Sequence, residues 1–330
     1  MSISRRAFLE SAALAGLASR ATAQSADPKT GMPMRVLGRT GAKVSIAGFG
    51  SGSRWLMYKE EEQALEALNR AIAGGVNYMD CAVNYGNGES ERRMGMFLKE
   101  RREGMWLVTK IQDRKYDDVM RVMDESLERL QTDHVDLLHM HALGGADDLA
   151  AIEASDGALK ALYELRDQKV SRFIGVTCHT DPDVLAACLE RHDLDCAQMP
   201  LNAGQVGVSA PSNVRGDEKS FQRIALPVAL KKNMGVAAMK VFAQEKLLPD
   251  AKPADLIRYT LSLPIASAVM GMPKLEHIDE DLRVAKNFVP MPESEMKEFS
   301  ERLSAAKKKS IDAFFANHRD ICDRHGAQLG

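Results

Sequence analysis

The chain alternates short apolar runs with longer amphipathic stretches. Within Asp117–Gln131, for example, apolar residues recur at helical spacing and leave the opposite face polar. A short apolar run bounded by turn residues is typical of a buried strand. Eight such runs are present: Val44–Phe49, Val76–Met79, Trp106–Thr109, Val135–Met140, Phe173–Val176, Cys196–Met199, Val236–Met239 and Ala268–Met270. This order predicts strands alternating with helices, and therefore an α/β protein whose parallel sheet is covered on its faces.

The spacing of these runs favours a closed barrel over an open sheet. The seven steps from Val44 to Ala268 span 224 residues, about 32 residues per step. Eight strand–helix units of this length are typical of a (β/α)8 TIM barrel. An open doubly wound sheet is the alternative. However, no Gly-x-Gly-x-x-Gly motif follows the first strand, which weakens a classical dinucleotide-binding fold.

Both ends of the repeat carry additional structure. Met34–Ser45 alternates about a glycine-containing turn, which is the pattern of a β-hairpin. Two helical stretches, Glu293–Lys307 and Ser310–His325, follow the eighth unit. No segment rich in Pro, Gly or Ser divides the chain. We therefore expect one barrel domain over residues 34–330, with an N-terminal hairpin and a C-terminal helical extension.

The first residues have the pattern of an export signal. Arg5-Arg6 precedes a weakly apolar stretch over residues 12–19, and Ala21-Thr22-Ala23 supplies small residues before a cleavage point. These features in this order are typical of a twin-arginine signal. We therefore expect a signal peptide over 1–23, a polar linker over 24–33, recognition by the twin-arginine export machinery and a periplasmic location. A basic amphipathic helix at the N-terminus of a cytoplasmic protein is the alternative.

Composition narrows the classes of function. With 330 residues, 45% of them hydrophobic, the chain can bury a substantial core. Its 44 basic residues nearly balance 46 acidic ones, which does not favour a nucleic-acid surface. No apolar run reaches the roughly 18 residues that a membrane-spanning helix needs. The five cysteines are too scattered for a disulfide scaffold or a Cys-x-x-Cys metal site. We expect a soluble monomer that acts on a small molecule.

Ionisable residues gather where three consecutive strands are predicted to end. The second predicted strand ends in Asp80, directly after its apolar run, and Tyr85 follows. The third ends in Lys110 and the fourth in His141. In a TIM barrel, the carboxyl ends of the strands carry the chemistry. A phenol is a poor acid at neutral pH, but a neighbouring ammonium lowers its pKa, and an aspartate holds that ammonium in place. With a histidine to orient a carbonyl oxygen, such a set would protonate the carbonyl while another group delivers hydride.

Each of these residues also has a purely structural interpretation. Asp80 would cap a turn, Lys110 would pair with a buried acid, and Tyr85 and His141 would pack as ordinary rings. His139 competes with His141 for the histidine role, and the two could ligate zinc together with Asp80. No third histidine has ligand spacing, so we predict no metal. The occurrence of all four residues at consecutive strand ends favours the functional interpretation.

Two longer motifs match a known family. Leu37–Ser45 matches a hairpin that closes the bottom of a barrel, and Asn77–Gly86 matches a signature in which four residues separate Asp and Tyr. In these motifs the sequence resembles the aldo/keto reductases, and the likeness runs from about Met34 to Lys286. The resemblance implies NAD(P)H-dependent reduction of an aldehyde or ketone to an alcohol. It also implies a catalytic tetrad of Tyr85 as general acid, Lys110 and Asp80 to tune Tyr85, and His141 to position the substrate.

The resemblance further implies a nicotinamide cofactor along the barrel mouth, NADPH with NADH as the alternative. The implied binding residues are Ser51, Thr177, Gln198, Met239, Lys240, Gly271, Lys274, His277 and Asp281. Some depart from the family pattern: Thr177 stands for a serine, Met239 for a tyrosine that stacks on the nicotinamide, and Asp281 for a common asparagine. A carboxylate near this position opposes a further phosphate, so the expectation of NADPH rests on the family pattern.

Two other functions stay open at this stage. Lys110 could form a Schiff base, as in a barrel aldolase. Alternatively, the protein could be a nicotinamide-binding module with little turnover, although an intact tetrad argues against it. Specificity in this architecture comes from loops, here around residues 144–156 and 203–219, and from the C-terminal tail. These stretches contain few aromatic residues, so the sequence does not identify the substrate.

Overall fold

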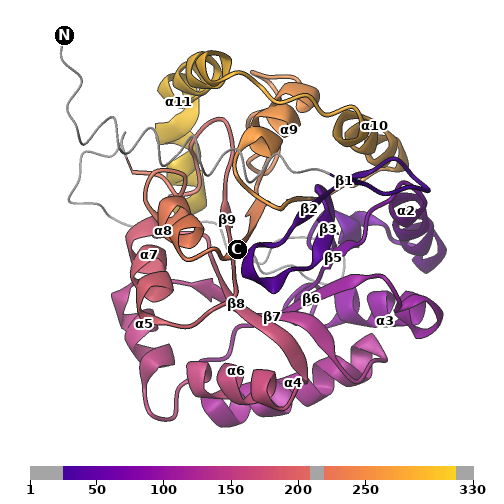
Figure 1. Ribbon diagram of the computed structural model, residues 1–330, viewed down its shortest axis with the longest axis vertical. Coiled ribbons are helices and arrows are strands. Elements are labelled where there is room, and N and C mark those ends of the chain that lie inside the picture. Colours follow the sequence, from indigo (N-terminus) through magenta and orange to yellow (C-terminus); the bar gives the residue numbers. More distant parts are fainter. Residues whose placement is uncertain (1–24, 209–218, 317–330) are drawn as a thin grey trace.

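The computed structural model describes residues 25–208 and 219–316. The predicted signal peptide, most of the loop expected around 203–219 and the end of the C-terminal tail lie outside these ranges. Figure 1 shows a ring of helices around central strands, with the N-terminal hairpin near the middle of the view. Of the helices in the described ranges, none is both long and apolar enough to cross a membrane.

Eight parallel strands close into a barrel. They follow one another around the barrel in sequence order, and the last pairs with the first. The strands are β4 (Ala47–Gly50), β5 (Tyr78–Asp80), β6 (Trp106–Ile111), β7 (Val135–Leu143), β8 (Ser171–Cys178), β9 (Cys196–Pro200), β10 (Gly235–Met239) and β11 (Ser267–Met270). Every predicted run overlaps one of these strands. The predicted (β/α)8 barrel is confirmed, and the open sheet was the wrong alternative.

The barrel strands are buried on both sides, which is why their sequences are nearly continuous apolar runs. Inside the barrel, Tyr78, Trp106 and Leu137 belong to one cluster, which Leu37 and Val44 of the hairpin also join. Side chains on the outer side of the strands pack beneath the helices in a second, larger cluster. The lower half of the barrel is therefore filled with apolar side chains, and polar groups are left to the upper end.

Helices cover the outside of the barrel. They are α2 (Glu61–Ala73), α3 (Glu89–Arg101), α4 (Tyr116–Leu130), α5 (Ala146–Glu153), α6 (Ala158–Asp167), α7 (Pro182–Arg191), α8 (Ala225–Lys231), α9 (Pro253–Ser262), α10 (Leu275–Lys286) and α11 (Glu293–Ala316), with the short 3-10 helices η1 (Gly38–Thr40) and η2 (Trp55–Met57). Helix α4 matches the helix expected over Asp117–Gln131. Helix α5 lies inside the stretch 144–156 that we expected to be a loop.

The C-terminal extension differs from the prediction of two helices. Helix α11 runs without interruption through the basic residues 307–309, between the two stretches that we expected to be separate helices. Lys308 in this run is buried, with only 4% exposure. Its ammonium donates to Asp312 Oδ2 at 2.7 Å and to the carbonyl of Gln205 at 2.6 Å. A lysine in the middle of the helix thus fastens α11 to the loop after β9.

The N-terminal hairpin closes the lower end of the barrel, as expected. Strands β2 (Pro33–Val36) and β3 (Lys43–Ser45) pair antiparallel, and β1 (Ser25–Ala26) adds a third strand inside the stretch expected to be a linker. Val44, the first residue of the first predicted run, belongs to this hairpin. Gly38 has φ +49° and approaches the start of barrel strand β10 so closely that a Cβ would lie 2.3 Å from the nitrogen of Gly235. Only glycine fits this junction between hairpin and barrel.

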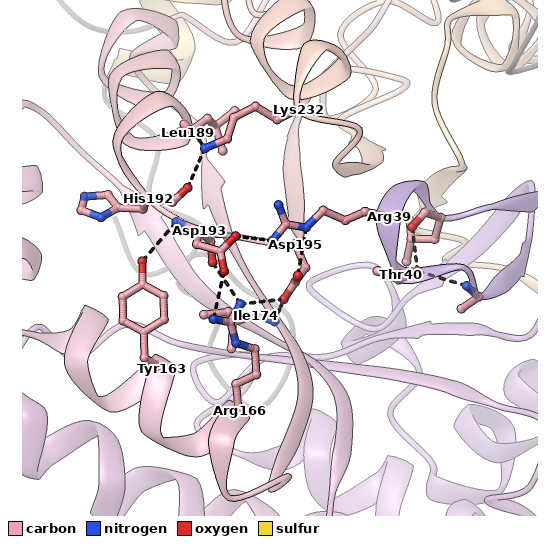
Figure 2. Close-up of polar contacts among 12 residues, drawn as sticks. Arg39, Thr40, Tyr163, Arg166, Ile174, Leu189, His192, Asp193, Asp195 and Lys232 are labelled. Carbon is pink, nitrogen blue, oxygen red and sulfur yellow. Dashed lines mark hydrogen bonds and ion pairs between the residues drawn. The ribbon is translucent and has the colours of Figure 1, made fainter.

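Ion pairs hold the hairpin in place (Figure 2). Arg39 of the hairpin and Arg166 of α6 both contact Asp193 and Asp195, which precede β9. Asp195 is largely buried, and its Oδ2 also accepts a hydrogen bond from the amide of Ile174 at 3.0 Å. The hydrogen bond from Arg39 holds the pKa of Asp193 below its usual range. The network links the hairpin, α6 and two barrel strands.

Candidate active site

The parallel register brings the predicted tetrad to one end of the barrel. Asp80 pairs in register with Val108, and Lys110 pairs with His139, so β5, β6 and β7 end side by side. Because side chains alternate along a strand, residues two positions apart point to the same side. Lys110 therefore points into the barrel together with Val108 below it, and His141 lies above His139.

A buried ion pair occupies the centre of this end. Lys110 Nζ lies 2.6 Å from Asp80 Oδ1 and also donates to the carbonyl of Cys81 at 2.7 Å. The amide Nε2 of Gln198 donates to the other carboxylate oxygen, Asp80 Oδ2, at 3.0 Å. The Lys110 and Asp80 side chains are only 1% and 3% exposed. A buried charge pair keeps its geometry when its remaining donors and acceptors are satisfied, as they are here.

Tyr85 lies directly beside this pair, in the turn between β5 and α3. Its backbone nitrogen donates to Ala82, and its carbonyl accepts from Ser90. The ammonium of Lys110 lies 5.0 Å from the centre of the Tyr85 ring. The ring of His141 meets the Tyr85 ring edge to face, with centres 5.8 Å apart. The structure thus brings all four predicted residues together around one phenol.

The two histidines of β7 have different environments. His141 contacts the rings of Tyr85 and His179. His139 is fully buried one layer lower, and burial together with the charge of Lys110 holds its pKa well below the usual range. Its ring fills the space beside Gly175, where a Cβ would lie 2.6 Å from Nδ1. Both histidines are fully buried, and of the two it is His141 whose ring contacts that of Tyr85.

A long groove extends from the tetrad across the upper rim of the barrel. Asp80, Tyr85, His179 and Gln198 line one end of it, and the far end reaches α10. Its empty volume is about 1210 Å³, part of which is open solvent. Such a groove suits an extended ligand rather than a compact one.

The residues of this groove fit a nicotinamide cofactor. Gln198 Oε1 is buried and has no hydrogen-bond partner in the described ranges, so a carboxamide N–H could satisfy it. Six of the predicted binding residues line the groove: Gln198, Met239, Lys240, Gly271, His277 and Asp281.

The other three predicted binding residues do not line the groove. Ser51 is buried and donates to the carbonyl of Asp80 at 2.7 Å. The hydroxyl of Thr177 accepts from the amide of Ala142 at 2.8 Å, where β7 bulges against β8. Lys274 is exposed and stands at the N-terminus of α10. The structure gives Ser51 and Thr177 a bracing position beneath the rim of the barrel.

The groove also contains residues that the sequence had not singled out. Arg54, from the loop after β4, reaches across to Gln244 at 3.2 Å and to Glu245 at 3.3 Å. Ala243, Gln244 and Glu245 all have positive φ values, from 48° to 67°. Consecutive non-glycine residues with left-handed backbone conformation are strained, and they are found where contacts with the surrounding structure hold them. No sequence motif predicts this contact across the groove, because Arg54 and Gln244 are 190 residues apart in the chain.

Cys81 and Cys178, which lie at the ends of β5 and β8, are buried. Burial raises the pKa of the Cys81 thiol far above its ordinary value and that of Cys178 to about 11. Thiols in such surroundings stay protonated and unreactive. In the part of the chain that the structure describes, no cluster of His, Cys, Asp or Glu could hold a metal ion.

Comparison with known proteins identifies the family. The family model described as "Aldo/keto reductase family" matches residues 46–255, more than half of the chain. The chain therefore belongs to the aldo/keto reductase family. L-galactose dehydrogenase from Arabidopsis thaliana is 34% identical over 161 residues, which cover 45% of this chain and 49% of that protein. The chain thus spans about half the length of that relative.

Solved structures share the fold. Aldo-keto reductase AKR11C1 from Bacillus halodurans (holo form) superposes with a TM-score of 0.67 at 22% identity, covering 84% of this chain and 98% of that one. An aldo-keto reductase from Klebsiella pneumoniae in complex with NADPH gives a TM-score of 0.64 at 19% identity, covering 83% and 96%.

Proposed function

We propose that this protein is an NADPH-dependent oxidoreductase that interconverts an aldehyde or ketone and the corresponding alcohol. The observation that carries the proposal is the buried Lys110–Asp80 pair beside the ring of Tyr85, at the end of a groove suited to an extended nucleotide. Membership of the aldo/keto reductase family supports the reaction class. NADPH is the cofactor, and the structure from Klebsiella pneumoniae solved with NADPH supports this choice.

In the reducing direction, Tyr85 gives its phenolic proton to the carbonyl oxygen. The bound nicotinamide supplies the hydride. Lys110 places positive charge where the phenolate forms, and Asp80 holds that charge in position. His141 positions the carbonyl oxygen toward Tyr85, and Gln198 both braces Asp80 and offers Oε1 to the carboxamide.

The same residues would support the reaction in reverse. The Tyr85 phenolate would then remove the proton of a substrate hydroxyl. L-galactose dehydrogenase is named for an oxidation, and sugar oxidation is therefore the second candidate direction. Sugar hydroxyls would suit a substrate end that contains His179 beside His141. Assays should follow both NADPH consumption with aldehydes and NADP⁺ reduction with aldoses.

The test of the proposal is the Tyr85→Phe variant. It removes one hydroxyl, so turnover should fall about 10²–10⁴-fold in both directions while nucleotide binding survives. Tyr163→Phe is the matched control, because Tyr163 lies on α6 and its hydroxyl accepts from the amide of Asp193. Retained turnover in Tyr85→Phe would refute the role of Tyr85.

Two rival functions give different results. A Schiff-base enzyme would be trapped on Lys110 by borohydride in the presence of substrate, and it would need no nucleotide. A binding module would hold NADPH without turning over any carbonyl or aldose tested.

We propose further that the protein is exported by the twin-arginine route. The proposal rests on Arg5-Arg6 and on the Ala21-Thr22-Ala23 site, both outside the described ranges. Mass spectrometry of the native protein should find a mature N-terminus at Gln24 and should report any co-purifying dinucleotide. Replacing both arginines by lysine should keep the protein in the cytoplasm. A wild-type protein found only in the cytoplasm with Met1 intact would contradict export.

A further inference from the structure

The two ends of the groove have different chemical character. The nicotinamide must lie against Tyr85 for hydride transfer, and Tyr85 lies at one end. The rest of an extended dinucleotide would then follow the groove toward α10, which would place its adenosine half, with the 2′-phosphate of NADPH, over α10. At that end the groove is lined by His277, Glu280 and Asp281 of the helix.

Asp281 is unusual among these residues. Its side chain is almost fully buried, with 5% exposure, although it lines the groove. It makes no hydrogen bond or ion pair within residues 25–208 and 219–316. A buried carboxyl group without a partner is costly unless it is protonated or meets a ligand. Among the described residues, Asp281 is therefore a buried acid that lines the groove and that a bound nucleotide could satisfy.

The surroundings of Asp281 do not neutralise it. The other residues with charged or titratable side chains that line the same groove are Arg54, Asp80, Tyr85, His179, Lys240, Glu245, His277 and Glu280. The ammonium of Lys240 lies 4.7 Å from the centre of the Phe315 ring. Arg54 is paired with Glu245 across the groove.

The two helices packed on α10 bring no free cation either. Arg70 of α2 pairs with Glu66 and Asp279, and Arg258 of α9 pairs with Glu295. The adjacent Glu280 adds negative charge. Burial first, and Glu280 second, raise the pKa of Asp281 to about 7.

We propose that Asp281 is a specificity-determining residue that makes the binding of NADPH, but not that of NADH, depend on protonation of its carboxyl group. The proposal rests on the nucleotide site proposed above, but not on carbonyl reduction. The protonated acid can donate to a phosphate oxygen, whereas the ionised acid repels the phosphate. Glu280 and Asp281 both line this end of the groove, so protonation of Asp281 removes one of the two negative charges that a phosphate there would meet.

The direction of the effect follows from the two forms. NADPH affinity should be high below pH 7 and should fall as the pH rises through 7, because the ionised form becomes dominant. By reciprocity, bound NADPH must favour the protonated acid, so binding near pH 7 takes up a proton. The 2′-phosphate itself titrates near pH 6, roughly, and contributes its own pH dependence. A variant that removes only Asp281 separates the two contributions.

The experiment is titration calorimetry of the wild-type protein with NADPH and NADH at pH 6, 7 and 8. The ratio of the NADPH to the NADH dissociation constant should rise about tenfold between pH 6 and 8 in the wild type. In Asp281→Asn, most of this rise should disappear and NADPH should bind tightly at pH 8. Titrations in buffers of different ionisation enthalpy should show proton uptake with NADPH in the wild type, and less in the variant.

Asp279→Asn is the matched control. Asp279 lies on the same helix and loses the same charge, but it pairs with Arg70 at 3.1 Å and does not line the groove. Its pH profile should equal that of the wild type.

Three outcomes would overturn the proposal. The first is equal NADPH profiles in the wild type and Asp281→Asn, and the second is an effect of Asp279→Asn as large as that of Asp281→Asn. Failure of the wild type to bind either nucleotide would overturn the nucleotide site as well. Normal binding with no turnover would leave this inference standing and refute only the proposed reaction. The measurement of proton uptake on NADPH binding uses the wild-type protein alone, so the proposal can still be tested if a variant does not fold.

Discussion

The two ends of the barrel use charged residues in opposite ways. At the lower end, Arg39, Arg166, Asp193 and Asp195 form a shared network in which every charge has more than one partner. At the upper end, the buried pair Lys110–Asp80 is placed against a phenol, and Asp281 lines the groove without a polar partner among the residues that the structure describes. The lower network joins elements that are far apart in sequence, whereas the upper groups are directed at a ligand.

This difference follows the general division of labour in TIM barrels, where the lower face stabilises and the upper face reacts. Substitutions at the upper end should therefore change activity more than stability, and those at the lower end should do the reverse.

The largest effect is expected for Lys110→Met. The substitution removes the charge beside Tyr85 and leaves Asp80 buried without its partner. Turnover should fall at least about 10³-fold, because the phenolate is no longer stabilised. The unpaired carboxylate should also cost about 3–5 kcal/mol of unfolding free energy unless it becomes protonated.

Steady-state kinetics and urea unfolding would measure both quantities for Lys110→Met. A variant with near-normal turnover would show that the upper pair is only structural, and the contrast between the two ends would then be lost.

An intermediate effect is expected for Asp195→Ala at the lower end. The substitution removes the acceptor for Arg39, Arg166 and the amide of Ile174. We expect a loss of about 3 kcal/mol in unfolding free energy, since buried donors lose their partner. At a temperature where the variant is folded, kcat should stay within about twofold of the wild type, because the site is at the other end. A large fall in kcat with unchanged stability would reverse the comparison.

The smallest effect is expected for Asp193→Asn. Asp193 is 62% exposed, so its ion pairs with Arg39 and Arg166 should stabilise the fold by less than about 1 kcal/mol. The pKa of Asp193 is lowered in the fold, so this contribution is complete above the unfolded pKa of about 4 and is lost as the pH falls below it. Urea unfolding should show a larger difference between wild type and variant at pH 7 than at pH 3. An equal difference at both pH values would rule out the carboxylate as its source.

The sequence predicted the barrel well because the signal is repeated. Eight apolar runs at nearly constant spacing leave few architectures, and errors at single boundaries, such as Val44, do not change the result. The grouping of the tetrad was predictable for a related reason. Parallel strands that follow one another in sequence order end side by side, so the strand ends alone place Asp80, Lys110 and His141 close together. Their catalytic roles remain predictions that the variants above will test.

Two of the predicted cofactor residues have hydroxyls that bond within the barrel, which the sequence did not indicate. Thr177 points to the upper end of β8, but its hydroxyl accepts from Ala142 at a bulge in β7. Ser51 is flanked by groove residues and is itself turned inward to Asp80 and Ser90. A bulge or a one-residue change of direction depends on contacts between separate strands, and no local pattern encodes it.

By itself, the sequence determined the alternation of strands and helices, the hairpin, and the identity and order of the residues at the strand ends. These properties depend on local periodicity and on connections that are short along the chain. Only the tertiary structure decided that His141 rather than His139 meets Tyr85, that Arg54 crosses the groove to Glu245, and that Asp281 is buried without a polar partner in the described part of the chain. Those outcomes depend on which side chains from distant segments of the chain pack together. The burial of a titratable group among them determines whether its charged form is favoured.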